Sequence, residues 1–147
     1  MKNAVIDASV VLKWQLDDEI HVRESLALRD DMVVHGRIRL LAPVLLIYEV
    51  ANGLTVACRR KRVPKDVIPG LVRNLLDIGI VFITQEGGDI CATALRYDIS
   101  AYDAAYISLA ERERCELWTG DGELYKKTKE HFLHLRWVGD YKSGAQR

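Results

Sequence analysis

The sequence predicts an α/β fold of three layers, α/β/α, in which helices cover both faces of a central, mostly parallel sheet. Short apolar runs rich in β-branched residues alternate along the chain with longer segments of helical periodicity, which is typical of βα units. The chain has 147 residues, of which 49% are hydrophobic and 29% are charged, as in an ordinary globular protein. We therefore expect residues 1–147 to form a single domain around one core.

The predicted strands are short and end at polar or turn-forming residues. The first is Ala4-Val5-Ile6, which ends at Asp7. The second, at residues 39–42, stops before Pro43 because proline cannot donate a ladder hydrogen bond. The remaining strands are expected at residues 78–84, 115–119 and 135–138.

Helices are predicted between these strands. Ser9 can cap a short helix that runs to about Trp14, and a longer helix fits residues 18–34. Pro43 suits the first turn of the next helix, which runs to the basic cluster at residues 59–62. Further helices are expected after Pro64, at residues 87–97, at residues 101–114 and around Lys126 and Lys127, followed by a frayed tail at residues 141–147.

Composition excludes few function classes. Lys+Arg and Asp+Glu are both 21, so the net charge of +0 gives no sign of a nucleic-acid partner. The three cysteines, at 58, 91 and 115, contain no C-x-x-C pair, which argues against a disulfide framework or a zinc knuckle. No apolar stretch reaches the roughly 20 residues that span a bilayer, and the start of the chain lacks a signal-peptide pattern. We expect a cytoplasmic protein with no membrane partner.

Four acidic residues are embedded in apolar or small residues: Asp7, Glu49, Asp103 and Asp121. Asp7 and Asp121 follow predicted strands, whose carboxyl ends meet at one edge of a parallel sheet. Glu49 and Asp103 lie near the starts of helices, which can return to the same edge. Burying an unpaired carboxylate is costly, whereas a hard divalent cation takes oxygen ligands. The four acids therefore predict a metal site at this edge.

Each acid also has a purely structural explanation. Asp7 could cap the helix that follows it, and Asp121 could be a turn residue between two glycines. Asp103 fits a capping box at the start of its helix. Glu49 is the hardest to explain in this way, because its neighbours are apolar and the closest polar residue on its helix face is Asn52.

The four acids occur in four motifs that follow one another along the chain. These are Val5-Ile6-Asp7-Ala8-Ser9-Val10-Val11, Tyr48-Glu49-Val50-Ala51-Asn52-Gly53-Leu54, Tyr102-Asp103-Ala104-Ala105-Tyr106-Ile107-Ser108-Leu109-Ala110 and Thr119-Gly120-Asp121. Together they resemble the PIN-domain ribonucleases, and within that family the toxins of VapBC-type toxin–antitoxin pairs. Two departures are mild: Ala8 stands where the family often has a hydroxyl residue, and Gly120 with Gly122 make the last loop more flexible than it needs to be.

The resemblance implies a PIN-like fold and an endoribonuclease that hydrolyses phosphodiester bonds with Mg²⁺ or Mn²⁺. Carboxylates and water suit these cations, whereas Zn²⁺ would favour His or Cys ligands. Glu49 either binds a second ion or accepts a proton from the attacking water. The expected metal ligands are Asp7, Asp103 and Asp121, and the side chains expected to hold the carboxylates in place are Ser9, Asn52 and Thr119.

The resemblance also implies an RNA substrate, a small cognate antitoxin and a homodimer, with exposed apolar faces of the early helices as docking surfaces. The run Arg59-Arg60-Lys61-Arg62 is the best candidate for contacts with the RNA backbone. Its structural alternative is a solvated helix end, where cations also suit the helix dipole. Lys126, Lys127 and Lys129 form a second candidate strip. His131 and His134 are interpreted as surface residues.

Two other functions compete with a ribonuclease. A non-catalytic PIN-fold module could bind RNA or protein without cutting, but the complete set of acids counts against it. A phosphorelay receiver or an aspartate-nucleophile phosphatase would also use an Asp after a strand together with Mg²⁺. However, the receiver's acidic pair is absent before Asp7, and Ser9 stands where that phosphatase motif requires a second Asp.

Overall fold

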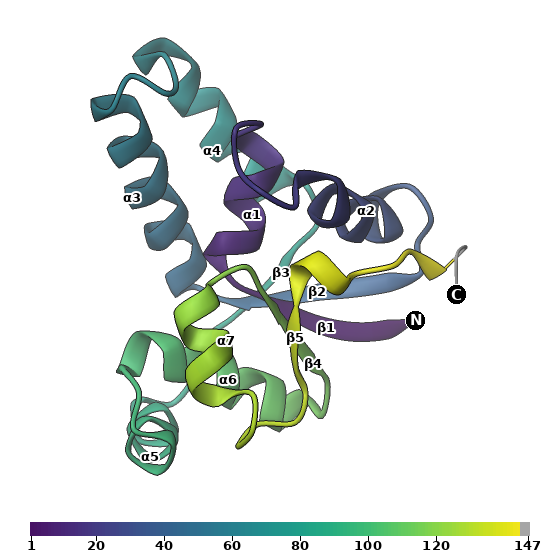
Figure 1. Cartoon of the computed structure of the whole chain (residues 1–147), viewed down its shortest axis with the longest axis vertical. Coiled ribbons are helices and arrows are strands. Elements are labelled where there is room, and N and C mark those ends of the chain that lie inside the picture. The colour runs from purple at the N-terminus through teal and green to yellow at the C-terminus, as the bar shows by residue number, and fades with distance from the viewer. Residues whose placement is uncertain (145–147) are drawn as a thin grey trace.

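A five-stranded sheet in the order β3-β2-β1-β4-β5 organises the protein, and every strand pairing is parallel. The structure is a computed structural model that describes residues 1–144 (Figure 1). The α/β class predicted from the sequence is confirmed. The strands are β1 (Lys2–Ile6), β2 (Ile38–Pro43), β3 (Val81–Ile83), β4 (Glu116–Thr119) and β5 (Leu135–Trp137).

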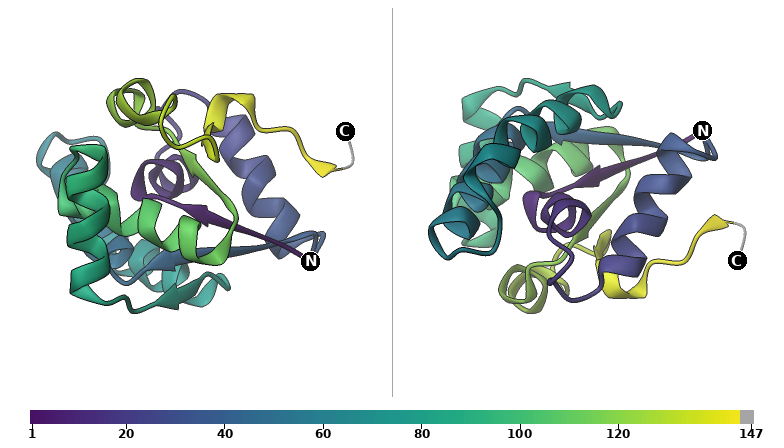
Figure 2. Two further views of the ribbon diagram at one scale, coloured as in Figure 1. Left: turned by 90° about the horizontal axis from the view of Figure 1, so that it is seen from below. Right: turned by 90° about the horizontal axis from the view of Figure 1, so that it is seen from above.

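Helices cover both faces of this sheet. α1 and α2 lie on one face, and α6 lies on the other with α5 outside it (Figure 2). α3 and α4 extend beyond the carboxyl ends of the strands as a projecting pair (Figure 1). The α-helices are α1 (Ala8–Gln15), α2 (Val22–Val33), α3 (Leu45–Arg59), α4 (Ile68–Asp77), α5 (Gly87–Tyr97), α6 (Ala101–Glu113) and α7 (Gly122–Thr128), with 3-10 turns at Lys65–Val67 and Val138–Asp140.

The direction in which the chain crosses the sheet reverses at the central strand β1. The first crossovers lead from β1 to β2 and then to β3, and the later ones lead to β4 and β5 on the other side of β1. Ile6 pairs with Trp118, so the carboxyl ends of β1 and β4 lie side by side. In open parallel sheets, ligands bind in the crevice outside such a reversal point. Asp7 and Asp121 follow these two strands.

A close contact between α1 and α3 orients the helix that carries Glu49. A Cβ atom at Gly53 would lie 2.7 Å from Cδ1 of Leu12, so the absence of a side chain lets the two helices approach. Leu46, Val50 and Leu54 are fully buried on the same helix and anchor it in the core. Glu49 lies in the second turn of α3 and stays near the edge of the sheet.

Two helix boundaries differ from the sequence prediction. α2 begins at Val22 rather than at residue 18, because residues 16–21 form a loop in which His21 adopts a left-handed conformation with φ 57°. Pro43 ends β2 and does not lie in the first turn of the helix, which begins at Leu45. Pro43 can belong to the strand because it pairs with Ile83 at the strand end. There the missing N–H costs only one hydrogen bond, and the carbonyl can still accept one.

The prediction of a frayed tail is wrong for residues 141–144, and residues 145–147 lie outside the described part of the chain. Tyr141 is buried, and its hydroxyl donates to Oδ2 of Asp31 at 2.7 Å. The backbone N–H of Gly144 donates to the same oxygen at 3.1 Å. Asp31 is on α2, 110 residues away, so no local pattern near the tail revealed this anchor. Within residues 1–144, no helix combines the length and apolar character needed to cross a membrane.

Candidate active site

Asp7 is both a helix cap and a buried carboxylate at the carboxyl edge of the sheet. It is 6% exposed, and its Oδ1 accepts a hydrogen bond from the backbone N–H of Val10 in the first turn of α1. The Ser9 hydroxyl donates to Oδ1, and the Thr119 hydroxyl donates to Oδ2 at 2.5 Å. Two of the predicted supporting residues, Ser9 and Thr119, therefore contact the carboxylate they were expected to hold.

The Asp7 carboxyl is poorly solvated for an ionised group. Burial raises its pKa to about 6, although the hydrogen bonds from Ser9, Thr119 and Val10 favour the charged form, and the negative charge of Asp121 raises the pKa further. A nearby cation would stabilise the ionised form of this buried carboxyl. The capping role accounts for the hydrogen bond with Val10 and does not offset the burial.

The loop that carries Asp121 is held by the same side chains. The backbone N–H of Gly120 donates to Oγ of Ser9 at 2.7 Å, and that of Asp121 donates to Oγ1 of Thr119 at 3.0 Å. Asp121 is the N-cap of α7 and accepts hydrogen bonds from the first turn. A Cβ at Gly120 would lie 2.7 Å from Cε of Lys13 and 3.3 Å from Oγ of Ser9. Gly120 therefore lets the loop pack closely on α1, which corrects the expectation that it only loosens the loop.

Glu49 has a partner that the sequence did not indicate. The Tyr106 hydroxyl donates to Oε1 of Glu49 at 2.5 Å, which joins α3 to α6 across 57 residues. Tyr106 is 2% exposed, and its pKa is raised by burial and by this hydrogen bond with Glu49. The only sequence signal was its position three residues after Asp103 in the same motif, which places both on one helix face.

Asp103 and Glu49 share the electrostatic environment of the other acids. Burial raises the pKa of both carboxyls, and the charge of Asp121 adds to the increase in each. Asp103 itself raises the pKa of Glu49, whereas Lys127 opposes the increase at Asp103. The capping interpretation of Asp103 is also correct, because its backbone N–H donates to Oγ of Ser100 at 3.1 Å. The Ser100 hydroxyl also lowers the pKa of the Asp103 carboxyl, but burial and the charge of Asp121 outweigh this effect.

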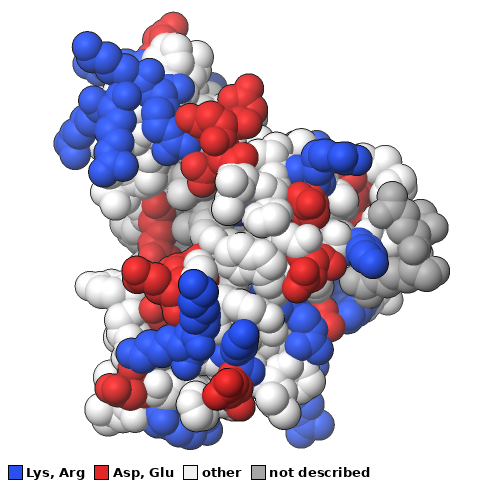
Figure 3. All heavy atoms as spheres, viewed as in Figure 1, with Lys and Arg blue, Asp and Glu red and all other residues white. Residues whose placement is uncertain are grey.

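Acidic side chains gather on the surface between the base of α3 and α7, which we call the acidic patch (Figure 3). A basic patch covers the far end of α3, and another lies over α7 (Figure 3). The charge of Asp121 raises the pKa of Asp7, Glu49 and Asp103, so its carboxylate is near enough to act on all three. Repulsion among carboxylates gathered in this way decreases when a divalent cation binds.

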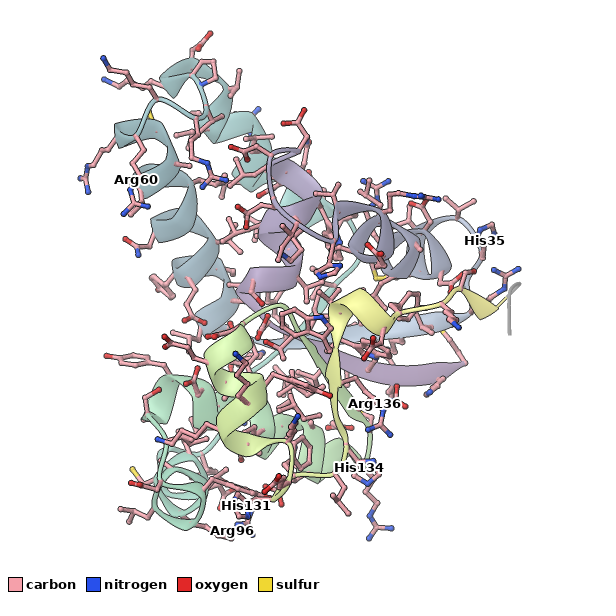
Figure 4. All side chains as sticks on the ribbon, in the orientation of Figure 1. His35, Arg60, Arg96, His131, His134 and Arg136 are labelled. Atoms are coloured by element: carbon pink, nitrogen blue, oxygen red, sulfur yellow. The ribbon has the colours of Figure 1, made fainter. Side chains whose placement is uncertain are left out.

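The oxygen atoms of the acids are suitable ligands for a hard, hexacoordinate cation, but they do not form a preassembled coordination site. Within residues 1–144, no three His, Cys, Asp or Glu side chains lie close enough to form a ready-made metal cluster. Mg²⁺ usually keeps several waters and binds through one or two carboxylates, so it does not require a ready-made cluster. Asp7, Asp103 and Asp121 supply oxygen donors only, and the exposed His131 and His134 lie elsewhere (Figure 4).

Not every predicted residue reaches the acids. Asn52 is exposed and makes no side-chain hydrogen bond with the residues that the structure describes. Arg60 points outward from the end of α3, away from the acidic patch (Figure 4). Arg62 is bound in a bidentate ion pair with Asp18, at 2.7 and 2.8 Å, and also contacts Glu19. An RNA contact through Arg62 would have to replace these ion pairs.

Replacing Tyr106 by phenylalanine is expected to lower the rate of catalysis with little loss of stability. The change removes the hydroxyl that holds Glu49 and keeps the buried ring, so the glutamate gains rotamer freedom. We expect kcat to fall about tenfold or more with KM for RNA changed less than threefold. Tyr125→Phe, on α7, is the matched control. Equal kcat values for wild type and Tyr106→Phe would show that this hydrogen bond does not position Glu49.

A comparison with known protein families matches residues 4–130 to the PIN domain. This chain belongs to the PIN-domain family. The match covers all four acids, residues 4–6 of β1 and all of β4. The family resemblance predicted from the four motifs is thereby confirmed.

Two proteins from Pyrobaculum aerophilum are similar to this PIN-domain chain. Ribonuclease VapC3 is 28% identical over 127 residues, which cover 84% of this chain and 92% of the relative. The crystal structure of PAE2754 superposes with a TM-score of 0.68 at 24% identity, over 93% of this chain and 84% of that one. The second likeness establishes the fold, and the first establishes a distant homology to a VapC ribonuclease.

Proposed function

We propose that this PIN-domain protein is a Mg²⁺- or Mn²⁺-dependent endoribonuclease. The observation that carries the proposal is the gathering of four carboxylates at the reversal point of the sheet. Burial and the negative charge of Asp121 raise the pKa of the other three. A carboxylate site of this kind, flanked by two basic patches, suits a cation and a phosphodiester. The homology to a relative named as a ribonuclease supports RNA as the substrate.

The chain's own residues would orient the reactants and move the proton. When bound, the cation would supply an activated water and offset charge on the phosphate oxygens. Asp7, Asp103 and Asp121 would hold it, directly or through water. Ser9 and Thr119 fix the Asp7 carboxylate through the two hydrogen bonds described above. Tyr106 occupies one oxygen of Glu49, which leaves Oε2 to accept a proton from the attacking water or to contact a second ion.

The decisive experiment compares cleavage of structured RNAs by wild-type protein and by Asp103→Asn, with Mg²⁺, with Mn²⁺ and with a chelator. The substitution keeps the backbone N–H that donates to Ser100, so the start of α6 should persist. We expect cleavage only with metal and a loss of at least about a hundredfold in the variant. Binding of RNA without cleavage would indicate the alternative, a non-catalytic PIN-fold module. Absence of both cleavage and Mn²⁺ binding would refute the proposal.

The basic run at the end of α3 is proposed to bind the RNA backbone. Arg59, Arg60 and Lys61 are exposed, and the patch they form lies beyond the acids along α3 (Figure 3). Lys127 belongs to α7, and its positive charge lowers the pKa of the Asp103 carboxyl. An RNA strand that crosses the acids would therefore meet positive charge at both ends of its path.

Reversing two charges in the run is expected to weaken RNA binding and to flatten its salt dependence. In Arg60→Glu with Lys61→Glu, two phosphate contacts are lost, so the slope of log K against log salt concentration should decrease by about one to two. Arg23→Glu with Arg39→Glu makes the same charge change at exposed positions on α2 and β2 and serves as control. If both doubles bind RNA alike, the run is a solvated helix end.

We further infer a toxin role, with a small antitoxin as inhibitor, from the homology to a protein named VapC3. Exposed apolar side chains support protein partners and self-association: Tyr48 is 70% exposed, Tyr102 65% and Leu95 84%. Expression of the chain should arrest growth, and coexpression with the product of a short neighbouring reading frame should restore it. Growth arrest that persists in Asp103→Asn would separate toxicity from catalysis and contradict this role.

A further inference from the structure

Lys13 is a buried cation that the proposed catalytic mechanism does not use. It lies on α1, one turn after Ser9, and is 4% exposed. Lysine is seldom buried without a partner, because removing an ammonium from water is costly. Its Nζ lies 4.0 Å from Oε1 of Glu19, which is the ion pair available to it. One ion pair at this distance offsets only part of the cost of burial, so the other contacts of the side chain bear on why it is buried.

The stem of Lys13 lies under the loop that carries Asp121. A Cβ at Gly120 would meet Cε of Lys13 at 2.7 Å, so the lysine stem fills the space that a side chain at position 120 would need. Ser9 and Lys13 are four residues apart and share one face of α1. Ser9 accepts the hydrogen bond from Gly120, and Lys13 packs against the same glycine. Two adjacent side chains of α1 thus contact one residue of the loop.

The counterion of Lys13 is itself fixed. While Oε1 of Glu19 faces Lys13, Oε2 accepts a hydrogen bond from Nη2 of Arg62 at 2.7 Å. Arg62 also forms its bidentate pair with Asp18. Glu19 therefore does not depend on Lys13 for its position, and the ammonium has a stationary anchor. We expect an ammonium anchored in this way to restrain the lysine stem beneath Gly120.

We propose that Lys13, anchored by Glu19, is a positioning residue that holds the Gly120–Asp121 loop against α1. It acts on the acidic site through Gly120 and makes no contact with the substrate. Its consequence for metal binding rests on the proposed function, because that proposal makes Asp121 a metal ligand. The loop-holding role itself is a property of the metal-free protein and can be measured without any reaction.

Hydrogen exchange in metal-free protein tests the loop-holding role. In Lys13→Ala we expect the Gly120 N–H to exchange at least about tenfold faster relative to the N–H of Val5 in β1, which reports global opening. Lys13→Arg should restore part of the protection, and Lys2→Ala, at the opposite end of β1, should leave the ratio unchanged. An equal increase at Gly120 and Val5 would mean that Lys13 stabilises the fold generally and would overturn the proposal.

Glu19→Gln provides a second variant that leaves the packed stem in place. Glu19 is 30% exposed, so the fold should tolerate the change. In Glu19→Gln the exchange rate of the Gly120 N–H should increase by a smaller factor than in Lys13→Ala. No increase would show that Glu19 does not anchor Lys13. Mn²⁺ binding followed by paramagnetic resonance should weaken about tenfold in Lys13→Ala. Wild-type protein that binds Mn²⁺ but cuts no RNA refutes the proposed function alone, whereas unchanged exchange in Lys13→Ala refutes the role of Lys13 alone.

Discussion

Asp7→Asn is expected to abolish RNA cleavage and, at the same time, to stabilise the metal-free protein at pH 7. The folded-state pKa of Asp7 is raised to about 6, so the ionised carboxylate is disfavoured by folding. A carboxyl whose pKa is raised contributes stability at low pH and loses it as the pH rises from about 4 to about 6. At pH 7 this loss is on the order of 3 kcal/mol, and a neutral amide avoids it.

The local structure should tolerate this change. Asn caps helices about as well as Asp, so the hydrogen bond with Val10 can persist. The hydroxyls of Ser9 and Thr119 can donate or accept, which lets them satisfy an amide as well as a carboxylate. The loss of cleavage follows because an amide is a much weaker ligand for Mg²⁺ than a carboxylate.

Thermal unfolding in chelator at pH 7 and pH 5 measures this effect. We expect the melting temperature of Asp7→Asn to exceed that of the wild type by several degrees at pH 7 and by less at pH 5, where the wild-type carboxyl is largely protonated. Asp121→Asn is the matched control, because this carboxylate is exposed and should affect cleavage without the gain in stability. A lower melting temperature for Asp7→Asn at pH 7 would show that its hydrogen bonds outweigh its burial.

Asp31→Asn is expected to destabilise the protein by about 2–4 kcal/mol and to leave the acidic site intact. Asp31 is 1% exposed and accepts hydrogen bonds from Tyr141, Ser143 and Gly144, and from Arg37 at 2.8 Å. An amide cannot serve all these donors, and it leaves the guanidinium without its charge partner. The cluster joins the C-terminal segment to α2 near the amino end of β1 (Figure 1), whereas Asp7 follows the carboxyl end of that strand.

The pH dependence of this contribution has the opposite sign to that of Asp7. Burial alone would raise the pKa of Asp31, but the hydrogen bonds from Tyr141 and Arg37, followed by those from Gly144 and Ser143, lower it to about 2. The stabilisation is therefore present above about pH 4 and is lost as the pH falls towards 2. Urea unfolding at pH 7 and pH 3 should show the gap between wild type and Asp31→Asn narrowing at pH 3. Asp30→Asn, one residue earlier and more exposed, is the control, and equal unfolding of the two variants would contradict the prediction.

The acidic site could be predicted because its signals are local. A run such as Ala4-Val5-Ile6 followed by Asp7 marks a buried strand and the polar residue at its end, and the same holds around Asp121. Parallel strands bring those ends together whatever the details of packing. Boundaries were less predictable: residues 18–21 have a helix-like composition, yet their acids pair with Arg62 and keep the chain in a loop.

The sequence by itself determined the fold class, the family and the positions of four acids at one edge of the sheet, since each follows from periodicity or from a contiguous motif. Ser9 and Thr119, which hold Asp7, could be named from the motifs, whereas only the tertiary structure showed the long-range contacts. Tyr106 meets Glu49, Lys13 lies under Gly120, and Asp31 anchors Tyr141, in each case between elements far apart in the chain. Such pairs leave no periodic signal, because burial and hydrogen bonding depend on distance in space rather than on spacing along the chain.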